Sequence, residues 1–148
     1  MSDVKKLLPI GRDIFEKESP YGDTHTFDEM RTAKLILDLL NLGKDNAIIL
    51  LAEDDTGKIV GILAAIKTFT TMGFEPTAME VIWWVAQDAR KSRLQLQLIH
   101  AFHYWCNRVG VSRIVLSSME NEHSQSVDRF YKRLGYKLTE HTYVKKVT

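Results

Sequence analysis

Three nearly continuous apolar segments in the middle of the chain limit most strongly what this sequence can fold into. They are Ile48–Ala52, Ile59–Ile66 and Met79–Ala86. Each has the length of a β-strand, and because both alternating sets of side chains are apolar, both faces of the resulting sheet must be shielded from water. The first two segments are separated by Glu53–Lys58, a run of turn-forming residues that predicts a β-hairpin. We therefore expect a central, mostly antiparallel sheet with helices on both faces.

Apolar residues recur at three- and four-residue spacing in three other segments, which predicts amphipathic helices. The first begins at Thr26 or Asp28, and glycines at positions 43, 110 and 135 are suited to end the three helices. A short strand at Arg113–Ser117 separates the last two helices. We also expect a short N-terminal strand and two closing strands, around Tyr136–Leu138 and Thr142–Val144. This order of elements predicts an α/β protein with a mixed sheet.

Composition is typical of a globular protein and excludes several classes of function. The 148 residues, 45% of them apolar and 26% charged, suffice to bury a core in a single domain spanning residues 1–148. A formal net charge of +1 argues against strong non-specific binding to nucleic acid. The single cysteine cannot form an internal disulfide, and no segment has the pattern of a signal peptide or a membrane span. We expect a cytoplasmic protein that binds neither nucleic acid nor membrane.

The last predicted helix ends in the sequence FYKRLGY, residues 130–136. This ending resembles the closing motif of the general-control-type N-acetyltransferase (GNAT) superfamily: an aromatic–tyrosine pair, two variable residues, leucine, glycine and an aromatic residue. The strand, polar turn, long helix, strand and helix that follow Met79 also occur in the order of that family. Within it, the chain most resembles small acetyltransferase-like proteins of bacteriophages, through residues 18–21, 83–85 and 89–90. That likeness implies the host cytoplasm as its location.

The resemblance implies acetyl-CoA as co-substrate. Backbone N–H groups at a helix N-terminus, aided by the helix dipole, are suited to hold its pyrophosphate, and residues 90–95 occupy that place in the sequence. Arg90 matches the family's pattern, whereas Arg93 and Gln95 stand where small residues are usual, and a Cβ there can narrow the groove or force a strained dihedral angle. The alternative is a solvated basic turn. The implied cofactor-binding residues are Trp84, Val85, Ala86, Arg90, Lys91, Ser92, Arg93, Leu94, Gln95 and Ser124.

Acetyl transfer also requires a neutral amine, stabilisation of the developing oxyanion and a proton for the departing thiolate. The resemblance implies Glu80 as the base, Tyr131 as the acid, and the backbone N–H of Val85, or of a neighbouring residue at the strand end, as the donor to the thioester carbonyl. Apolar neighbours can raise the pKa of Glu80 and improve it as a base. The structural alternatives are a solvated strand carboxylate for Glu80 and a core aromatic for Tyr131.

The leading functional hypothesis is an N-acetyltransferase that transfers acetyl from acetyl-CoA to a primary amine by direct attack. The acceptor, a small molecule or a protein, stays open, as does a homodimer through exposed strands or the final hairpin. The alternative is a non-catalytic GNAT-fold binding or virion-associated module that has lost cofactor use. On the long helix, His100 and His103 lie off the apolar stripe and are expected at the surface, whereas Cys106 lies on it and is expected in the core.

Overall fold

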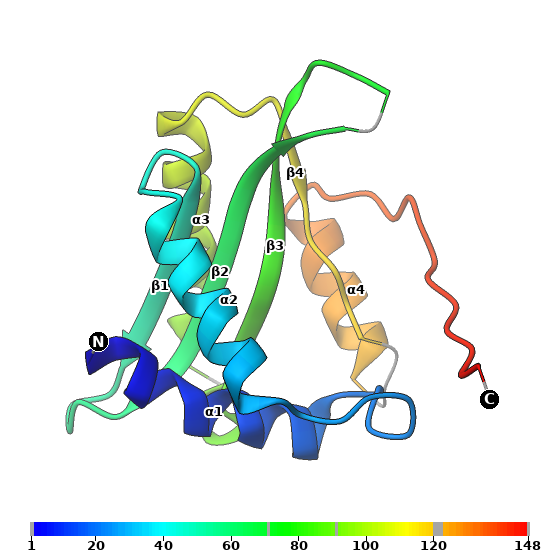
Figure 1. The fold of residues 1–148 in the computed structure, drawn as a ribbon. Helices are drawn as coiled ribbons and strands as arrows, with labels where there is room; N and C mark the ends of the chain where they lie inside the picture. Colours follow the sequence, from blue (N-terminus) through cyan, green and yellow to red (C-terminus); the bar gives the residue numbers. More distant parts are fainter. Residues whose placement is uncertain (1, 71, 91, 120–122, 148) are drawn as a thin grey trace. The chain divides into compact units, whose positions relative to one another are not determined.

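The computed structural model describes residues 2–70, 72–90, 92–119 and 123–147, and they form two compact units (Figure 1). One unit comprises residues 1–32 and 117–148, and the other comprises residues 33–116. Within the described ranges, no helix combines the length and the apolar character needed to cross a bilayer. The elements, in chain order, are α1 (Ser2–Glu18), α2 (Glu29–Asn41), β1 (Ala47–Glu53), β2 (Ile59–Phe69), β3 (Pro76–Val85), a 3-10 turn (Gln87–Ala89), α3 (Leu94–Arg108), β4 (Arg113–Val115) and α4 (Ser124–Arg133).

The unit of residues 33–116 is built on a four-stranded sheet with the order β1-β2-β3-β4. The first two pairings are antiparallel and the third, β3 with β4, is parallel, so the sheet is mixed. The hairpin predicted between β1 and β2 is confirmed. Its turn is held by Asp54, whose carboxylate accepts hydrogen bonds from the backbone N–H groups of Thr56 and Lys58 at 2.9 and 3.1 Å.

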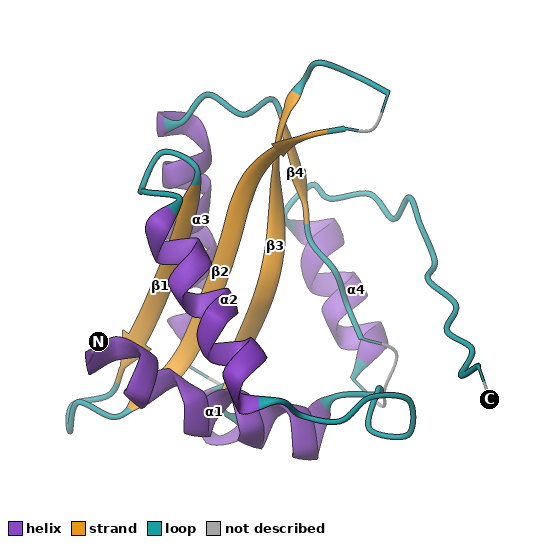
Figure 2. Ribbon diagram, in the orientation of Figure 1, coloured by secondary structure: helices purple, strands orange, loops and turns teal. Residues whose placement is uncertain are grey.

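Helices cover both faces of this sheet, as the apolar strands predicted (Figure 2). On one face, Leu39 of α2 forms a buried cluster with Ala47 and Ala64. On the other face, α3 approaches β2 so closely that a Cβ at Gly61 would lie 2.9 Å from the side chain of Leu98. Because side chains alternate between faces along a strand, positions 61 and 64 of β2 face opposite sides. The mixed α/β fold class is thus confirmed.

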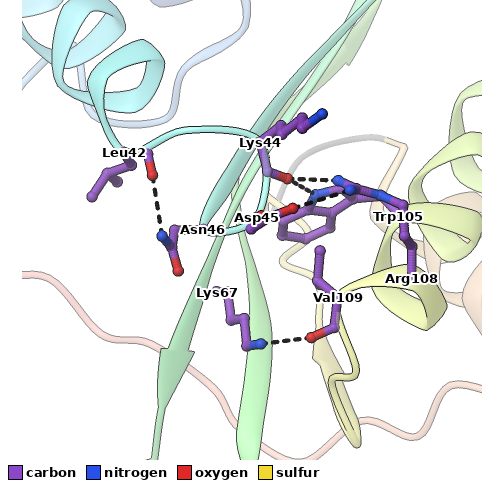
Figure 3. A network of polar contacts seen from close by, with 8 residues as sticks. All are labelled: Leu42, Lys44, Asp45, Asn46, Lys67, Trp105, Arg108 and Val109. Atoms are coloured by element: carbon purple, nitrogen blue, oxygen red, sulfur yellow. Dashed lines mark hydrogen bonds and ion pairs between the residues drawn. The ribbon is translucent and has the colours of Figure 1, made fainter.

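A network of polar contacts ties the C-terminal half of α3 to the loop before β1 (Figure 3). The indole N–H of Trp105 and the guanidinium of Arg108 both donate to the backbone carbonyl of Lys44, each at 2.7 Å. The ammonium of Lys67 on β2 donates to the carbonyl of Val109 at 2.6 Å. Since Trp105 is also buried, these contacts anchor one end of α3 against the sheet. Nearer the start of α3, Leu98 lies against Gly61, which pairs with Val85 at the far end of β3.

The structure corrects two expectations for the unit of residues 1–32 and 117–148. The predicted N-terminal strand is wrong, because residues 2–18 form helix α1, in which Val4, Leu7 and Ile14 recur at helical spacing and are buried. The closing strands at 136–138 and 142–144 are also wrong. Residues 136–147 contain no strand, and the side chains of Leu138 and Tyr143 are 57% and 91% exposed. A strand-like pattern forms a strand only when a neighbouring strand takes up its hydrogen bonds.

Candidate active site

Strands β3 and β4 pair along only a short part of their length. β4 is in register with Thr77–Met79, close to the start of β3, and no pairing with β4 extends beyond Met79. Six residues of β3, from Glu80 to Val85, therefore run on without β4 beside them. Figure 2 shows the strand-drawn part of β4 beside only one end of β3. Within the described residues, no strand lies beside this part of β3, and this side is called the open edge of β3 below.

Val85 ends β3 with its backbone turned toward this open side. The N–H of Ala86 donates to the carbonyl of Val60 at 2.8 Å, so positions 60 and 86 form a hydrogen-bonded pair. The adjacent pair, Gly61 and Val85, is then non-hydrogen-bonded, and the polar groups of Val85 point away from β2. The guanidinium of Arg90 donates to the Val85 carbonyl at 2.8 Å, which agrees with this direction. The N–H of Val85 is therefore suited to donate to a ligand, whereas the N–H of Ala86 is used by the sheet.

The described residues of the loop between β3 and α3 contain no left-handed backbone. Arg93, immediately before α3, has φ −76°, and within the described residues no residue other than glycine has a positive φ. The hydroxyl of Ser92 accepts a hydrogen bond from the N–H of Leu94 at 3.2 Å and donates to the carbonyl of Ala89 at 2.6 Å. Replacing the family's small residues by Arg93 and Gln95 thus creates no strained dihedral angle.

The start of α3 presents backbone donors. Within the described residues, no hydrogen-bond acceptor meets the N–H groups of Gln95 and Leu96. With the positive end of the helix dipole, these donors form an arrangement suited to an anion. Arg93 is exposed and Gln95 half-buried. Lys91, another predicted contact, lies outside the described residues.

Glu80 lies at an irregularity of β3. The register between β2 and β3 shifts at this point: Ala64 faces Ile82 while the next residue, Ala65, faces Glu80, which leaves Val81 as an extra residue. Such a β-bulge bends a strand and re-aims neighbouring side chains. Glu80 is half-buried and directly follows the last residue of β3 that is paired with β4. The sequence contains no turn-forming residue that would have indicated this bulge.

Trp84 also lies on this half of β3. It is half-buried and forms the hydrogen-bonded pair with Ile62 of β2, in register with Gly61 and Val85. Because Ile62 and Ala64 are two residues apart, Trp84 shares the face of the sheet that α2 covers. The predicted site residues that the structure describes on β3 and at the start of α3 therefore belong to a single unit.

Tyr131 and Ser124 belong to the other unit, on helix α4. The hydroxyl of Tyr131 donates to the backbone carbonyl of Ser117 at 2.6 Å. Tyr131 is half-buried, and its ring lies 5.7 Å from that of Tyr136. Ser124 is the first residue of the helix. The Ser117 carbonyl, which holds the tyrosine hydroxyl, was not predicted, because a backbone acceptor carries no signal in the sequence.

The glycine of the FYKRLGY ending, Gly135, terminates helix α4. Gly135 adopts φ +86°, its N–H donates to the carbonyl of Lys132 at 3.1 Å, and the N–H of Tyr136 donates to the carbonyl of Tyr131 at 3.0 Å. These two bonds constitute a Schellman motif, and the contact between the rings of Tyr131 and Tyr136 is the apolar contact that accompanies it. The motif therefore fixes the end of α4 directly at Tyr131.

Cys106 and His103 on α3 are at least partly buried, and burial shifts the pKa of each side chain. Cys106 is buried, as expected, and burial raises the pKa of its thiol to about 12, so it stays protonated near neutral pH. His103 is half-buried, and burial together with the neighbouring charge of His100 lowers the pKa of its imidazole. Within the described residues, no group of three or more potential ligands could hold a metal ion.

Comparison with known proteins identifies a family profile that this chain matches and structures of the same fold. The profile of the acetyltransferase (GNAT) family matches residues 10–136, which include parts of both units. No curated protein matches the sequence significantly.

Solved structures show the same fold at low sequence identity. An aminoglycoside 6'-N-acetyltransferase from Acinetobacter haemolyticus is 17% identical, with 99% of this chain and 94% of that chain covered and a TM-score of 0.70. An aminoglycoside acetyltransferase, AAC(6')-Iy, in complex with the bisubstrate analogue CoA-S-monomethyl-acetylneamine, is 14% identical, with 99% and 92% covered and a TM-score of 0.68. Glucosamine-6-phosphate N-acetyltransferase from Arabidopsis thaliana is 15% identical, with 95% and 94% covered and a TM-score of 0.66.

Proposed function

This chain belongs to the acetyltransferase (GNAT) family, and on that premise we propose that it transfers an acetyl group from acetyl-CoA to a primary amine by direct attack. The observation that carries the proposal is the open edge of β3, which ends at the outward-pointing N–H of Val85 and leads to the backbone donors at the start of α3. These groups suit an elongated ligand with an amide-rich arm and an anionic end, which is the chemistry of coenzyme A.

In this proposal the N–H groups of Gln95 and Leu96 hold the pyrophosphate, and the exposed cation of Arg93 adds charge. Ser92 holds the loop before α3 through its hydrogen bonds with Ala89 and Leu94, and Arg90 holds the end of β3 in place through the Val85 carbonyl. Ser124, at the start of α4, would supply a further donor. Acetyl-CoA brings an acetyl group activated as a thioester, while the chain's own residues bind, orient and move protons.

The proton movements are assigned to two residues. Glu80 removes a proton from the attacking amine, so that the nitrogen lone pair can form the new C–N bond. The N–H of Val85 donates a hydrogen bond to the carbonyl oxygen as negative charge develops there. When the C–S bond breaks, the departing sulfur takes a proton from Tyr131, whose hydroxyl the Ser117 carbonyl orients.

Two measurements on the purified protein test this function. Calorimetric titration with acetyl-CoA should show saturable binding, and incubation with a panel of primary amines should release free thiol. Tyr131→Phe is expected to lower kcat at least about tenfold with little change in acetyl-CoA affinity, since the hydroxyl acts on the leaving group. Tyr104→Phe is the matched control, because Tyr104 is a tyrosine on α3 that is 72% exposed.

The variant Glu80→Gln tests the removal of the proton from the attacking amine separately from the binding of acetyl-CoA. It keeps the shape of the side chain but cannot accept the amine proton, so kcat should fall about 10²- to 10⁴-fold while acetyl-CoA still binds. The loss should shrink at high pH, where more of the amine is already neutral. A rate that is equally low at every pH would contradict the role of base.

The same experiments distinguish the alternative function, which is a GNAT-fold binding or virion-associated module without cofactor use. Absence of heat and of a thermal shift at millimolar acetyl-CoA would exclude the acetyltransferase and favour the module. Retention of a captured partner by the double variant Arg90→Glu, Tyr131→Phe would support the module further. The panel of amines should include aminoglycosides, an amino sugar phosphate and a peptide N-terminus, because each presents the primary amine that the reaction requires.

A further inference from the structure

Strand β1 lies at an edge of the sheet and has β2 as its only neighbouring strand in the described residues. The chain was expected to begin with a strand, but residues 2–18 form helix α1, and a helix cannot continue the hydrogen-bonding ladder of a sheet. The opposite side of the sheet differs, since β4 at that edge is only three residues long. β1, with seven residues, is therefore the longer edge strand.

The direction of the backbone groups of β1 follows from its pairing. The N–H of Lys67 donates to the carbonyl of Asn46 at 2.7 Å, so positions 46 and 67 form a hydrogen-bonded pair. Counting along the register, Ile48 and Leu50 also bond to β2, while Ile49 and Leu51 form the non-hydrogen-bonded pairs. The N–H and C=O groups of Ile49 and Leu51 therefore point out of the sheet. In the described part of the chain, neither of these N–H groups finds an acceptor.

This edge lacks the features that usually prevent strands from joining. Residues 47–52 contain no charged residue and no proline, and the only irregularity of the pairing comes after Ala52. Protected edge strands carry an inward-pointing charge, a proline, a bulge or a very short length. The side chain of Leu51 is 38% exposed. The edge of β1 is thus suited to accept another strand.

We propose that this edge pairs with the same edge of a second copy of the chain, so that two sheets join into one across a twofold axis. An antiparallel pair of identical strands is self-complementary, and each contact is made twice. With the axis at Leu50, Ile49 of each copy faces Leu51 of the other, and each such pair exchanges two backbone hydrogen bonds. In this register Glu53 faces Ala47 of the second copy.

The neighbouring register is less favourable, which supports the axis at Leu50. With the axis at Ile49, Glu53 would face Asp45 of the second copy, and like charges directly opposite one another are destabilising.

The helices favour a second copy over a single added strand. A twofold axis perpendicular to the joined sheet places the two α2 helices on the same face. α2 has exposed leucines on both sides of its buried row of Ile36 and Leu39. They are Leu35 on one side and Leu37 and Leu40 on the other. Whichever side is turned toward the neighbouring copy, it offers an apolar surface that a lone peptide strand would leave exposed.

Hydrogen exchange of single backbone amides tests the proposal on the unmodified protein. Raising the protein concentration should slow exchange at Ile49 and Leu51 at least about tenfold, since only the dimer bonds these amides. Ile48 and Leu50 are the internal controls, because their amides bond to β2 in either state. Sedimentation should show a mass that doubles over the same range of concentration. A monomer at all concentrations, or concentration-independent exchange at Ile49 and Leu51, would overturn the proposal.

Two substitutions of Leu51 should abolish the dimer by different means. Leu51→Lys places a charge on both sides of the axis, and Leu51→Pro removes an outward N–H without touching the bonds to β2. Met72→Lys is the control, since it adds the same charge at a methionine that is 99% exposed in the loop between β2 and β3. A dimer retained in both folded Leu51 variants contradicts the proposal. None of these measurements involves acetyl-CoA, so their outcome is independent of the proposed activity.

Discussion

Substitution of Gly135 should lower the stability of the protein by an amount that follows from the backbone conformation of this residue alone. Its φ of +86° lies in the left-handed region, and a Cβ built on it would meet no atom within 4 Å. A side chain at this position therefore causes no clash, and the cost is the conformational preference of the backbone, about 1–2 kcal/mol for an ordinary residue. Asparagine tolerates this region better than alanine, and a β-branched residue tolerates it worst.

We expect the free energy of unfolding to fall by about 0.5 kcal/mol in Gly135→Asn, about 1 kcal/mol in Gly135→Ala and more in Gly135→Val. Urea unfolding followed by circular dichroism measures the series. If asparagine cost as much as alanine, or if valine and alanine were equal, backbone preference would not be the cause.

Gly110 is the matched control for function. It ends α3 with φ +69° and also has open space around its Cβ position. The same pair of hydrogen bonds is present, from the N–H of Gly110 to the carbonyl of Asn107 and from the N–H of Val111 to the carbonyl of Cys106. Gly110→Ala should therefore cost the same stability as Gly135→Ala. Only Gly135→Ala should lower kcat, because the carbonyl of Tyr131 takes part in that helix end. An equal loss of kcat in both variants would show that the effect is general destabilisation.

Three further predictions concern α3. Trp105→Phe should lower the free energy of unfolding by about 2–3 kcal/mol in urea titrations, since it removes buried indole surface and a hydrogen bond to the Lys44 carbonyl. Cys106 should resist thiol reagents at pH 8 until the protein unfolds, because burial keeps its thiol protonated. Since the folded protein holds this proton more tightly than the unfolded chain, the free energy of unfolding should fall as pH rises from 9.0 to about 12. The lowered pKa of His103 has the opposite effect, because the unfolded chain takes up the proton at a higher pH than the folded protein. The free energy of unfolding should therefore fall as pH drops below 6.5, and it should fall less steeply in the His103→Gln variant.

Features of the site with a local cause were predictable from the residues. The hairpin between β1 and β2 follows from a turn that Asp54 organises within a few residues. The ends of α3 and α4 follow from glycines whose positive φ is needed at a helix end. The FYKRLGY ending identified the family because its glycine and its two tyrosines act together within a single helix end.

Other features depended on contacts between distant parts of the chain. The bulge at Glu80 arises from the register of two strands and has no marker in the sequence. The open edge of β3 exists because β4 pairs with only three of its residues. Helix α1 was mistaken for a strand because three buried residues spread over about three turns are a weak periodic signal.

The sequence by itself determined which segments are apolar on both sides, where the helices end and which family the chain resembles, because those properties arise from residues close together in the chain. Only the tertiary structure decided where β3 loses its neighbour, which way the amides of Val85, Ile49 and Leu51 point, and that residues 136–147 contain no strand. Hydrogen bonding between strands depends on which segments meet and in what register, and that choice is made by the whole fold.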